Sequence, residues 1–262
     1  MRPRIVVAGS GTAGLACAAE LGGAAEATVV ERLPVIGGER WEEPRIAALQ
    51  AGAEGAGARF VAGSQVLRFT GTSVLVVGVT TAEVEADALV VATGHRPQTA
   101  AEAGIAGPRL AGVLPGTVAL HLLDHGVALG RRPLVFGGGK MADEVVERLR
   151  KQEVEATVVA DGRIVRLEGG PRVEAAWVEG TDREPERVAA DAVILARGRV
   201  PYRNVDGAVL PAAGVVFAQP GTEPADGPDV ERAGRAAAVE ALEAARAPRT
   251  AAEPPLRIGG PR

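Results

Sequence analysis

The sequence has few of the residues from which redox and metal sites are usually built. Its 262 residues include a single cysteine, Cys17, and three histidines. One cysteine excludes a dithiol/disulfide pair within the chain and any multi-cysteine zinc or iron–sulfur site. Cys17 stands among alanines on an expected helix, which favours a small buried side chain over a reactive thiol. His121 and His125 are one helical turn apart, but only Asp124 offers an acidic ligand nearby, so we expect no metal site.

Aromatic residues and long apolar runs are also scarce. Aromatics make up 3% of the chain and the net charge is -4, so nucleic acid is not an expected partner. No apolar run approaches the length of a membrane span, and residues 1–15 lead into a strand instead of a signal peptide. We therefore expect a soluble cytoplasmic protein. The abundance of glycine (35 residues) and a hydrophobic share of 47% favour parallel α/β layers with aliphatic strands.

A glycine-rich turn near the start of the chain has the spacing of a dinucleotide-binding motif. Gly9, Gly11 and Gly14 form G-x-G-x-x-G. The surrounding sequence predicts a strand, a helix and a second strand, at residues 4–8, 15–22 and 27–31. In such a turn the backbone approaches a pyrophosphate, and the N–H groups at the helix start face it. The alternative is a turn kept only for packing.

Glu31 is the expected ribose-binding residue of this first turn. It ends the second predicted strand, where a carboxylate accepts hydrogen bonds from ribose hydroxyls. The same carboxylate would repel a 2′-phosphate, which favours FAD or NAD over NADP.

A second, looser turn follows in the middle of the chain. Gly137, Gly139 and Ala142 fit G-x-G-x-x-A between predicted strands at 133–136 and 156–160, with a helix at about 141–151. Lys140 would bring a positive charge to a phosphate, and Asp161 follows the second strand. We regard NAD as a possible ligand here, preferred over NADP because of Asp161. The alternative is a vestigial domain kept as a scaffold.

The chain also repeats a closing segment, because residues 86–97 align without a gap with residues 190–201. We therefore predict an α/β fold with two Rossmann-like dinucleotide-binding domains, the second inserted in the first. The predicted FAD domain comprises residues 1–97 and 202–247, the NAD(P)-like domain residues 98–201, and the tail residues 248–262. Further predicted helices are at 46–58 and 230–245, and further strands at 59–66, 73–79, 88–92, 163–167, 173–179, 191–196 and 214–217.

These motifs resemble the FAD-dependent pyridine nucleotide–disulfide oxidoreductase superfamily. Ala92-Thr93-Gly94 is similar to its second FAD signature. The segments 109–115, 122–126, 130–133, 170–173 and 232–237 resemble the flavoprotein subunits of the hydrogen cyanide synthase, opine/proline dehydrogenase and sarcosine oxidase α group. The resemblance and the turns together give these expected FAD-binding residues: Gly9, Gly11, Thr12, Ala13, Gly14, Glu31, Arg32, Arg40, Trp41, Val66, Ala92, Thr93, Gly94 and Gln219. For NAD at the second turn they are Gly137, Gly139, Lys140 and Asp161.

The sequence departs from the superfamily pattern in two places. The last FAD signature of the superfamily ends a strand with Gly-Asp, whereas this chain has Gln219-Pro220. The segment between Gly38 and Arg59 is short where the superfamily carries a longer wall beside the flavin ring. No catalytic constellation is apparent, so the catalytic residues stay unknown.

The leading hypothesis is an FAD-binding subunit that passes electrons between the redox centre of a partner subunit and an acceptor, within a multi-subunit dehydrogenase or oxidase. Such a role implies one or more other subunits as partners, against which the Pro/Arg-rich tail could order. The alternative is a non-catalytic scaffold that holds ADP, ATP or an incomplete flavin. A self-sufficient NAD(P)H-dependent flavin reductase is the third reading.

Overall fold

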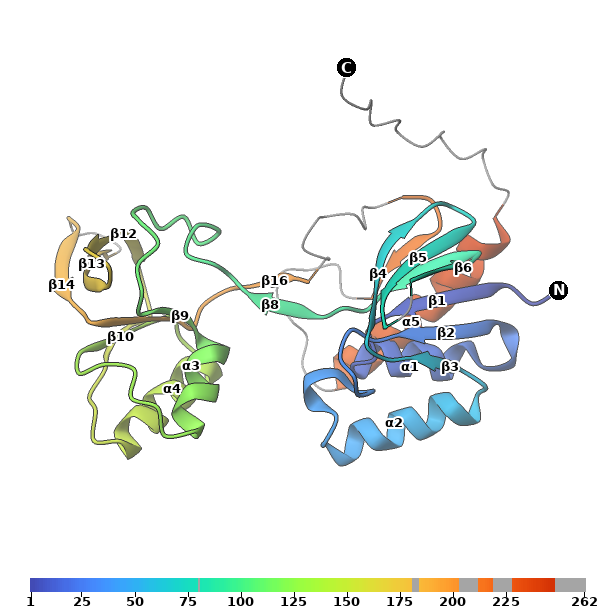
Figure 1. Ribbon diagram of the computed structural model, residues 1–262, viewed down its shortest axis with the longest axis horizontal. Coiled ribbons are helices and arrows are strands. Elements are labelled where there is room, and N and C mark those ends of the chain that lie inside the picture. The colour runs from blue at the N-terminus through green and yellow to red at the C-terminus, as the bar shows by residue number, and fades with distance from the viewer. Residues whose placement is uncertain (80, 181–183, 203–211, 219–227, 248–262) are drawn as a thin grey trace, which may run out of the picture. The chain divides into compact units, whose positions relative to one another are not determined.

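The computed structural model describes residues 1–79, 81–180, 184–202, 212–218 and 228–247. The predicted tail 248–262 and the pair Gln219-Pro220 lie outside them. The chain forms two compact units (Figure 1), one from Met1–Gly94 with the described residues from Pro201 onward, the other from His95–Val200. The second unit is therefore inserted in the first, and the sequence placed the boundaries at 97/98 and 201/202.

The first unit is built on a five-stranded parallel sheet of order β17-β7-β1-β2-β3. A separate three-stranded antiparallel sheet has the order β4-β5-β6. The strands are β1 (Arg4–Ala8), β2 (Glu26–Val30), β3 (Arg59–Val61), β4 (Ser64–Phe69), β5 (Ser73–Gly78), β6 (Ala82–Glu85), β7 (Ala88–Val91) and β17 (Val215–Phe217). The helices are α1 (Thr12–Leu21), α2 (Pro44–Gly55) and α5 (Pro228–Arg246), with short 3-10 turns η1 (Gly22–Ala24) and η2 (Gly38–Arg40).

The two faces of this sheet are covered by different layers. One face packs against α1, α2 and α5, where Leu15, Ile46 and Ala238 meet the strand residues. The other face packs against the antiparallel sheet. Gly234 lets α5 approach α1 closely, because a Cβ there would overlap the carbonyl of Ala13. The core is therefore aliphatic and depends on small residues, as the composition predicts.

The second unit repeats this plan with fewer strands. Its parallel sheet has the order β11-β10-β15-β9, and its antiparallel sheet the order β12-β13-β14. The parallel sheet packs against α3 and α4 on one face and against the antiparallel sheet on the other. The elements are β8 (His95–Pro97), β9 (Val113–Pro115), α3 (Gly116–Asp124), β10 (Pro133–Phe136), α4 (Lys140–Lys151), β11 (Thr157–Val159), β12 (Arg163–Gly169), β13 (Val173–Glu179), β14 (Glu186–Ala189), β15 (Ala192–Leu195) and β16 (Arg199–Pro201), with β8 paired to β16.

Equivalent aspartates explain part of the sequence repeat. The carboxylate of Asp87, just before β7, accepts a hydrogen bond from the N–H of Arg4 at 2.7 Å. The carboxylate of Asp191, just before β15, accepts from the N–H groups of Arg131 and Arg132 at 3.0 and 2.8 Å. In both units an aspartate therefore ties the start of the closing strand to the start of the strand that leads into the glycine turn.

The structure corrects the expected strand at 59–66. This stretch contains two strands in different sheets, because the chain turns at Gly63, whose φ is 65°. β3 pairs in parallel with β2, whereas β4 pairs antiparallel with β5. The helix expected at 46–58 begins earlier, with Pro44 in its first turn, and ends at Gly55.

Candidate functional site

Gly9, Glu31 and Ala92 lie side by side at the carboxyl edge of the first parallel sheet. The register aligns Ala8, the last residue of β1, with the last residues of β2 and β7. The alignment continues beyond the strands, because Gly9 N–H donates to the carbonyl of Val30 and Ala92 N–H to that of Ala8, each at 2.8 Å. Three residues predicted from the sequence thus lie next to one another, each directly after the end of its strand.

The three glycines of the first turn have different reasons for lacking a side chain. Gly9 has a φ of 102°, and a Cβ there would lie 2.5 Å from the carbonyl oxygen of Ala92. A Cβ on Gly14 would overlap the carbonyl of Gly9. Gly11 has an ordinary backbone conformation (φ -70°, ψ -172°), and a Cβ there would meet no protein atom within 4 Å. Nothing within the described protein therefore requires glycine at position 11.

Gly11 is also the residue at which α1 begins. Thr12 and Ala13 are the first helical residues, and the N–H of Leu15 donates to the carbonyl of Gly11 at 3.0 Å. The first N–H groups of a helix lack intrahelical acceptors, and the helix dipole adds positive charge at this end. The turn can therefore bind an anionic group directly in front of Gly11.

A buried polar network holds Glu31 beside the turn. Its Oε2 accepts hydrogen bonds from Ser10 N (2.9 Å) and Ser10 Oγ (2.7 Å), and its Oε1 accepts from Leu33 N (2.8 Å). Ser10 Oγ in turn accepts from Gly37 N–H at 2.8 Å. A carboxylate offers about four acceptor positions, so three donors leave one for a ribose hydroxyl. Ser10 was missed in the sequence, although it lies inside the glycine motif.

The other predicted FAD-binding residues lie in varied surroundings. Val66 is packed in the apolar core, so a ligand contact from it would come from its backbone. Arg40 binds the carboxylate of Glu43 through Nε and Nη2, at 2.6 and 2.8 Å. Trp41 is 50% exposed. Gln219 lies outside the described residues.

Arg32 and the Thr93-Gly94 pair are both connected to Tyr202, a residue the sequence analysis did not single out. The guanidinium carbon of Arg32 lies 5.6 Å from the centre of the Tyr202 ring. Thr93 Oγ1 donates to the carbonyl of Tyr202, and Tyr202 N–H donates to the carbonyl of Gly94 at 2.8 Å. No sequence pattern points to Tyr202, because its contacts join segments far apart in the chain.

The second turn occupies the same place in the second unit. Gly137 N–H donates to the carbonyl of Val159 at 2.9 Å, and Ala196 N–H to that of Phe136 at 2.8 Å. Gly139 precedes the first residue of α4, Lys140, which is exposed. Residues 137, 139 and 140 thus lie at the carboxyl end of β10, and their binding of NAD stays a prediction.

Asp161 differs from Glu31 in its position. In the register of the second sheet, Val159 is the partner of Phe136, so Ala160 takes the place that Glu31 has in the first sheet. Asp161 comes one residue later and is exposed. Its carboxylate is therefore not part of a buried lock like that of Glu31.

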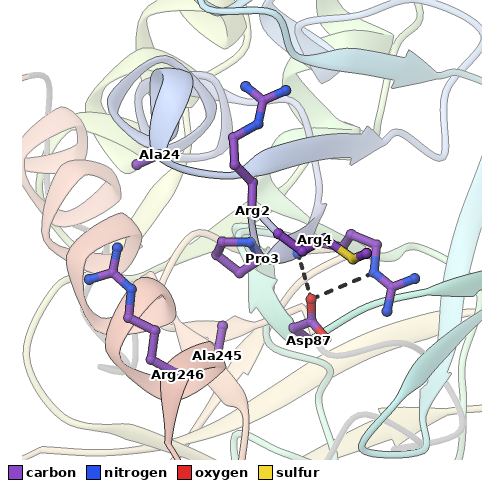
Figure 2. Close-up of a pocket in the computed structure, with 8 residues that line it drawn as sticks. Arg2, Pro3, Arg4, Ala24, Asp87, Ala245 and Arg246 are labelled. Atoms are coloured by element: carbon purple, nitrogen blue, oxygen red, sulfur yellow. Dashed lines mark hydrogen bonds and ion pairs between the residues drawn. The ribbon is translucent and has the colours of Figure 1, made fainter.

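A pocket of about 670 Å³ lies in the first unit, and no residue of the first glycine turn lines it (Figure 2). It lies at the opposite edge of the sheet, where β1 begins. Its lining residues are Met1, Arg2, Pro3, Arg4, Ala24, Asp87, Ala245 and Arg246. None of them belongs to the predicted cofactor-binding set, and the first glycine turn lies at the other end of the strands.

The cysteine and the potential metal ligands of the chain do not form a further reactive site in the described residues. Cys17 is fully buried, and burial, together with the charge of Glu20, raises the pKa of its thiol to about 12. The interpretation of Cys17 as a buried core residue is confirmed. In the described part of the chain, no three His, Cys, Asp or Glu side chains gather as a metal site. No helix within the described ranges is both long and apolar enough to cross a bilayer.

Two α/β units, each with a glycine turn between a strand and a helix, define a protein of the two-dinucleotide-domain type. Residues 1–114 match the family model described as pyridine nucleotide-disulphide oxidoreductase. This stretch includes the first turn and Ala92–Gly94, the segments on which the resemblance to that superfamily rests, so over residues 1–114 the match agrees with the superfamily predicted from the sequence. No curated protein sequence matches the chain.

Solved structures of oxidoreductases share the fold over nearly the whole chain. L-proline dehydrogenase from P. horikoshii matches with a TM-score of 0.61 and 21% identity, covering 93% of this chain and 55% of the other. An NAD-dependent persulfide reductase from A. fulgidus matches with a TM-score of 0.59 and 18% identity, covering 91% and 59%. Thioredoxin reductase from Lactococcus lactis matches with a TM-score of 0.57 and 15% identity, covering 93% and 99%.

The coverage differs among these structures. The chain spans little more than half of the proline dehydrogenase and persulfide reductase chains. It spans almost all of the thioredoxin reductase chain. At these identities the likeness concerns the fold.

Proposed function

We propose that the chain is an FAD-binding oxidoreductase subunit that relays electrons between the redox centre of a partner subunit and an acceptor. The complex would be a multi-subunit dehydrogenase or oxidase. The match of residues 1–114 to the pyridine nucleotide-disulphide oxidoreductase model supports the class of chemistry.

Gly11 is the single observation that carries the nucleotide-binding part of the proposal. Packing accounts for Gly9 and Gly14, but no protein contact or backbone strain accounts for Gly11. A side chain there would instead occupy the space in front of the helix start, where an anion is favoured. A ligand that must approach the backbone at this point explains the glycine.

The surrounding residues fit the ADP half of FAD. The N–H groups of Thr12 and Ala13 would meet the pyrophosphate, and the remaining acceptor position of Glu31 would take a ribose hydroxyl. When bound, FAD accepts and donates electrons itself, so the protein need only bind and orient it. This division of labour is compatible with the lack of a recognised catalytic constellation.

A partner subunit is proposed because the sequence has no pair of cysteines that could relay electrons from a bound flavin. Its single cysteine is buried, with a strongly raised thiol pKa, so a dithiol relay cannot pass electrons onward. Trp41, which is half exposed, is the kind of aromatic residue that is enriched at protein interfaces. Partner identity and substrate would then be set outside this chain.

The decisive variant is Gly11→Val. We expect it to fold normally and to lose FAD binding, because the added carbons fill the pyrophosphate approach. Gly55→Val is the matched control, since a Cβ on Gly55 also meets no protein atom within 4 Å but lies at the end of α2. Cofactor content after reconstitution, measured by absorbance and by mass spectrometry of the released ligand, reports the difference. Equal FAD content in both variants would contradict the proposal.

The scaffold alternative differs in what the bound nucleotide does. For a relay subunit, the bound flavin is reduced by the complex and reoxidised by an acceptor. For a scaffold, the released ligand is ADP or ATP, or the flavin does not turn over. Stopped-flow absorbance of the native complex separates the two.

NAD at the second turn, in preference to NADP, is a further part of the proposal. An exposed acid at Asp161 would repel a 2′-phosphate, whereas Lys140 would attract the pyrophosphate of either nucleotide. Titration with NADH and NADPH tests it, and tighter binding of NADPH would rule out the role of Asp161.

A further inference from the structure

Arg32 and Tyr202 meet across the first glycine turn. Arg32 follows β2, and Tyr202 is hydrogen-bonded to Gly94, which follows β7. In the sheet β1 lies between β2 and β7, with the ends of the three strands in register. A contact between the two flanking sides therefore crosses the end of β1, where the turn begins.

Tyr202 is fixed on the β7 side by two backbone interactions. Its N–H donates to the carbonyl of Gly94 at 2.8 Å, and its carbonyl accepts from Thr93 Oγ1. The side chain is partly buried. The ring is therefore a fixed surface, although the chain reaches it only after the whole second unit.

Arg32 is an exposed cation with few other constraints. Its guanidinium carbon lies 5.6 Å from the ring centre of Tyr202, within the range of a cation–π interaction. Within the described residues Arg32 makes no ion pair, and the neighbouring carboxylate of Glu31 already accepts from Ser10 and Leu33. The ring of Tyr202 is thus the feature that holds this guanidinium near the turn.

We propose that Tyr202 is a positioning residue of the nucleotide site, which holds the guanidinium of Arg32 above the first turn so that it binds the diphosphate of the ligand. This inference rests on the proposed nucleotide-binding function. An arginine that is already oriented loses less side-chain freedom on binding, so the ring would raise affinity without touching the ligand.

The test is a double-mutant cycle read by ADP binding. Tyr202→Leu should weaken ADP binding about five-fold, the equivalent of one exposed cation–π contact. Arg32→Gln should weaken it about ten-fold or more, because it removes a charged hydrogen-bond donor. If Tyr202 acts through Arg32, the double variant should bind no more weakly than Arg32→Gln alone. Tyr202→Phe keeps the ring and should stay within about two-fold of the unaltered protein.

Salt dependence supplies a readout that a structural role would not change. Screening weakens exposed charge interactions, so the affinity of the unaltered protein and of Tyr202→Phe should fall with added salt. For Arg32→Gln and Tyr202→Leu the fall should be shallower. Thermal unfolding of all four variants checks that each one folds.

The outcomes separate the inference from the proposed function. If the unaltered protein binds neither ADP nor FAD, both are overturned. If it binds and Tyr202→Leu binds equally well, only the positioning role is overturned. The same holds if the Tyr202→Leu effect persists at full size in the Arg32→Gln background, because the tyrosine would then act independently of the arginine.

Discussion

The two glycine turns share a backbone plan but are held in shape by different forces. At the first turn, Ser10 and Glu31 form a buried polar lock, and Gly11 has an unstrained backbone. At the second, the corresponding row has Gly138 and Ala160, and Gly139 has a φ of 77°. The first turn thus has a carboxylate held in place by hydrogen bonds, whereas the second depends on backbone conformation.

The comparison shows that the spacing of the glycine motif does not reveal whether the acidic residue of a turn is held in place. Both turns satisfy nearly the same glycine pattern, yet among the described residues only the acid of the first turn, Glu31, accepts hydrogen bonds that fix it. Asp161 is exposed and one residue further along than Glu31. Of the two candidate sites, the first turn is therefore the one whose acidic side chain has a fixed position.

The largest expected difference in stability concerns the third glycine position of the motif, which is Gly14 in the first turn and Ala142 in the second. Gly14→Ala should destabilise the protein by about 3 kcal/mol or more, because its Cβ would overlap the carbonyl of Gly9. Ala142→Gly, the matched change in α4, should cost only about 1 kcal/mol, since it loses one methyl and helix propensity. Urea unfolding of each variant gives both values, and similar values would break the comparison.

At the second glycine position of the motif, Gly11 and Gly139, we expect the substitution in the second turn to be the more destabilising one. Gly139→Ala should cost about 2 kcal/mol, because a φ of 77° with a ψ of -169° is strained for any residue with a Cβ. Gly11→Ala should change the free energy of unfolding by less than about 0.5 kcal/mol. Thermal unfolding without nucleotide tests this, and a destabilised Gly11→Ala would mean that protein packing, not a ligand, requires the glycine.

Removal of the polar lock should sharpen the contrast further. Ser10→Ala takes a hydroxyl donor from Glu31 and an acceptor from the N–H of Gly37, so we expect a loss of about 1–2 kcal/mol together with weaker nucleotide binding. Gly138→Ala, at the equivalent place, should leave stability within about 0.5 kcal/mol. Denaturant unfolding and ADP titration of the pair would show whether the lock serves binding as well as folding.

The smallest expected effect concerns the aspartate of the second unit. Burial raises the pKa of Asp191, but hydrogen bonds from the backbone N–H groups of Arg132 and Arg131 outweigh it and hold the pKa below its ordinary value of 3.8. A depressed pKa in the folded state stabilises the protein above about pH 4 and loses that contribution as the pH falls. Asp191→Asn should therefore remove about 1 kcal/mol at neutral pH and less in acid. The free energy of unfolding of both proteins is measured from pH 7 to pH 3. A difference between them that does not shrink as the pH falls would contradict this prediction.

Much of the fold was readable in the sequence because its signals are local. The strands at 4–8 and 133–136 and the helices that follow the glycines were predicted from aliphatic runs beside glycine turns, and β10 and β13 have the predicted bounds. The split of 59–66 was not predicted, because Gly63 changes sheet within a continuous apolar run. The short strands β8 and β16 were also missed, since each is stabilised mainly by the other across a hundred residues of chain.

The candidate site was only partly readable for the same reason. Spacing identified Gly9, Gly11 and Glu31, which lie in one continuous segment. It gave no access to the partners of Glu31, nor to Tyr202, whose contacts depend on how distant segments fold together. Sequence patterns therefore located the turn, and the structure supplied the side chains around it.

The approach of α5 to α1 at Gly234 has a consequence for how the chain folds during synthesis. α1 is made before the inserted unit, but the helix that covers it and the outer strand β17 emerge only after residue 214. The inserted unit, His95–Val200, is complete on the ribosome by then and can fold as its own domain. The first unit must wait with part of its apolar face uncovered. Slow translation between residues 200 and 246 would lengthen that exposure and with it the risk of aggregation.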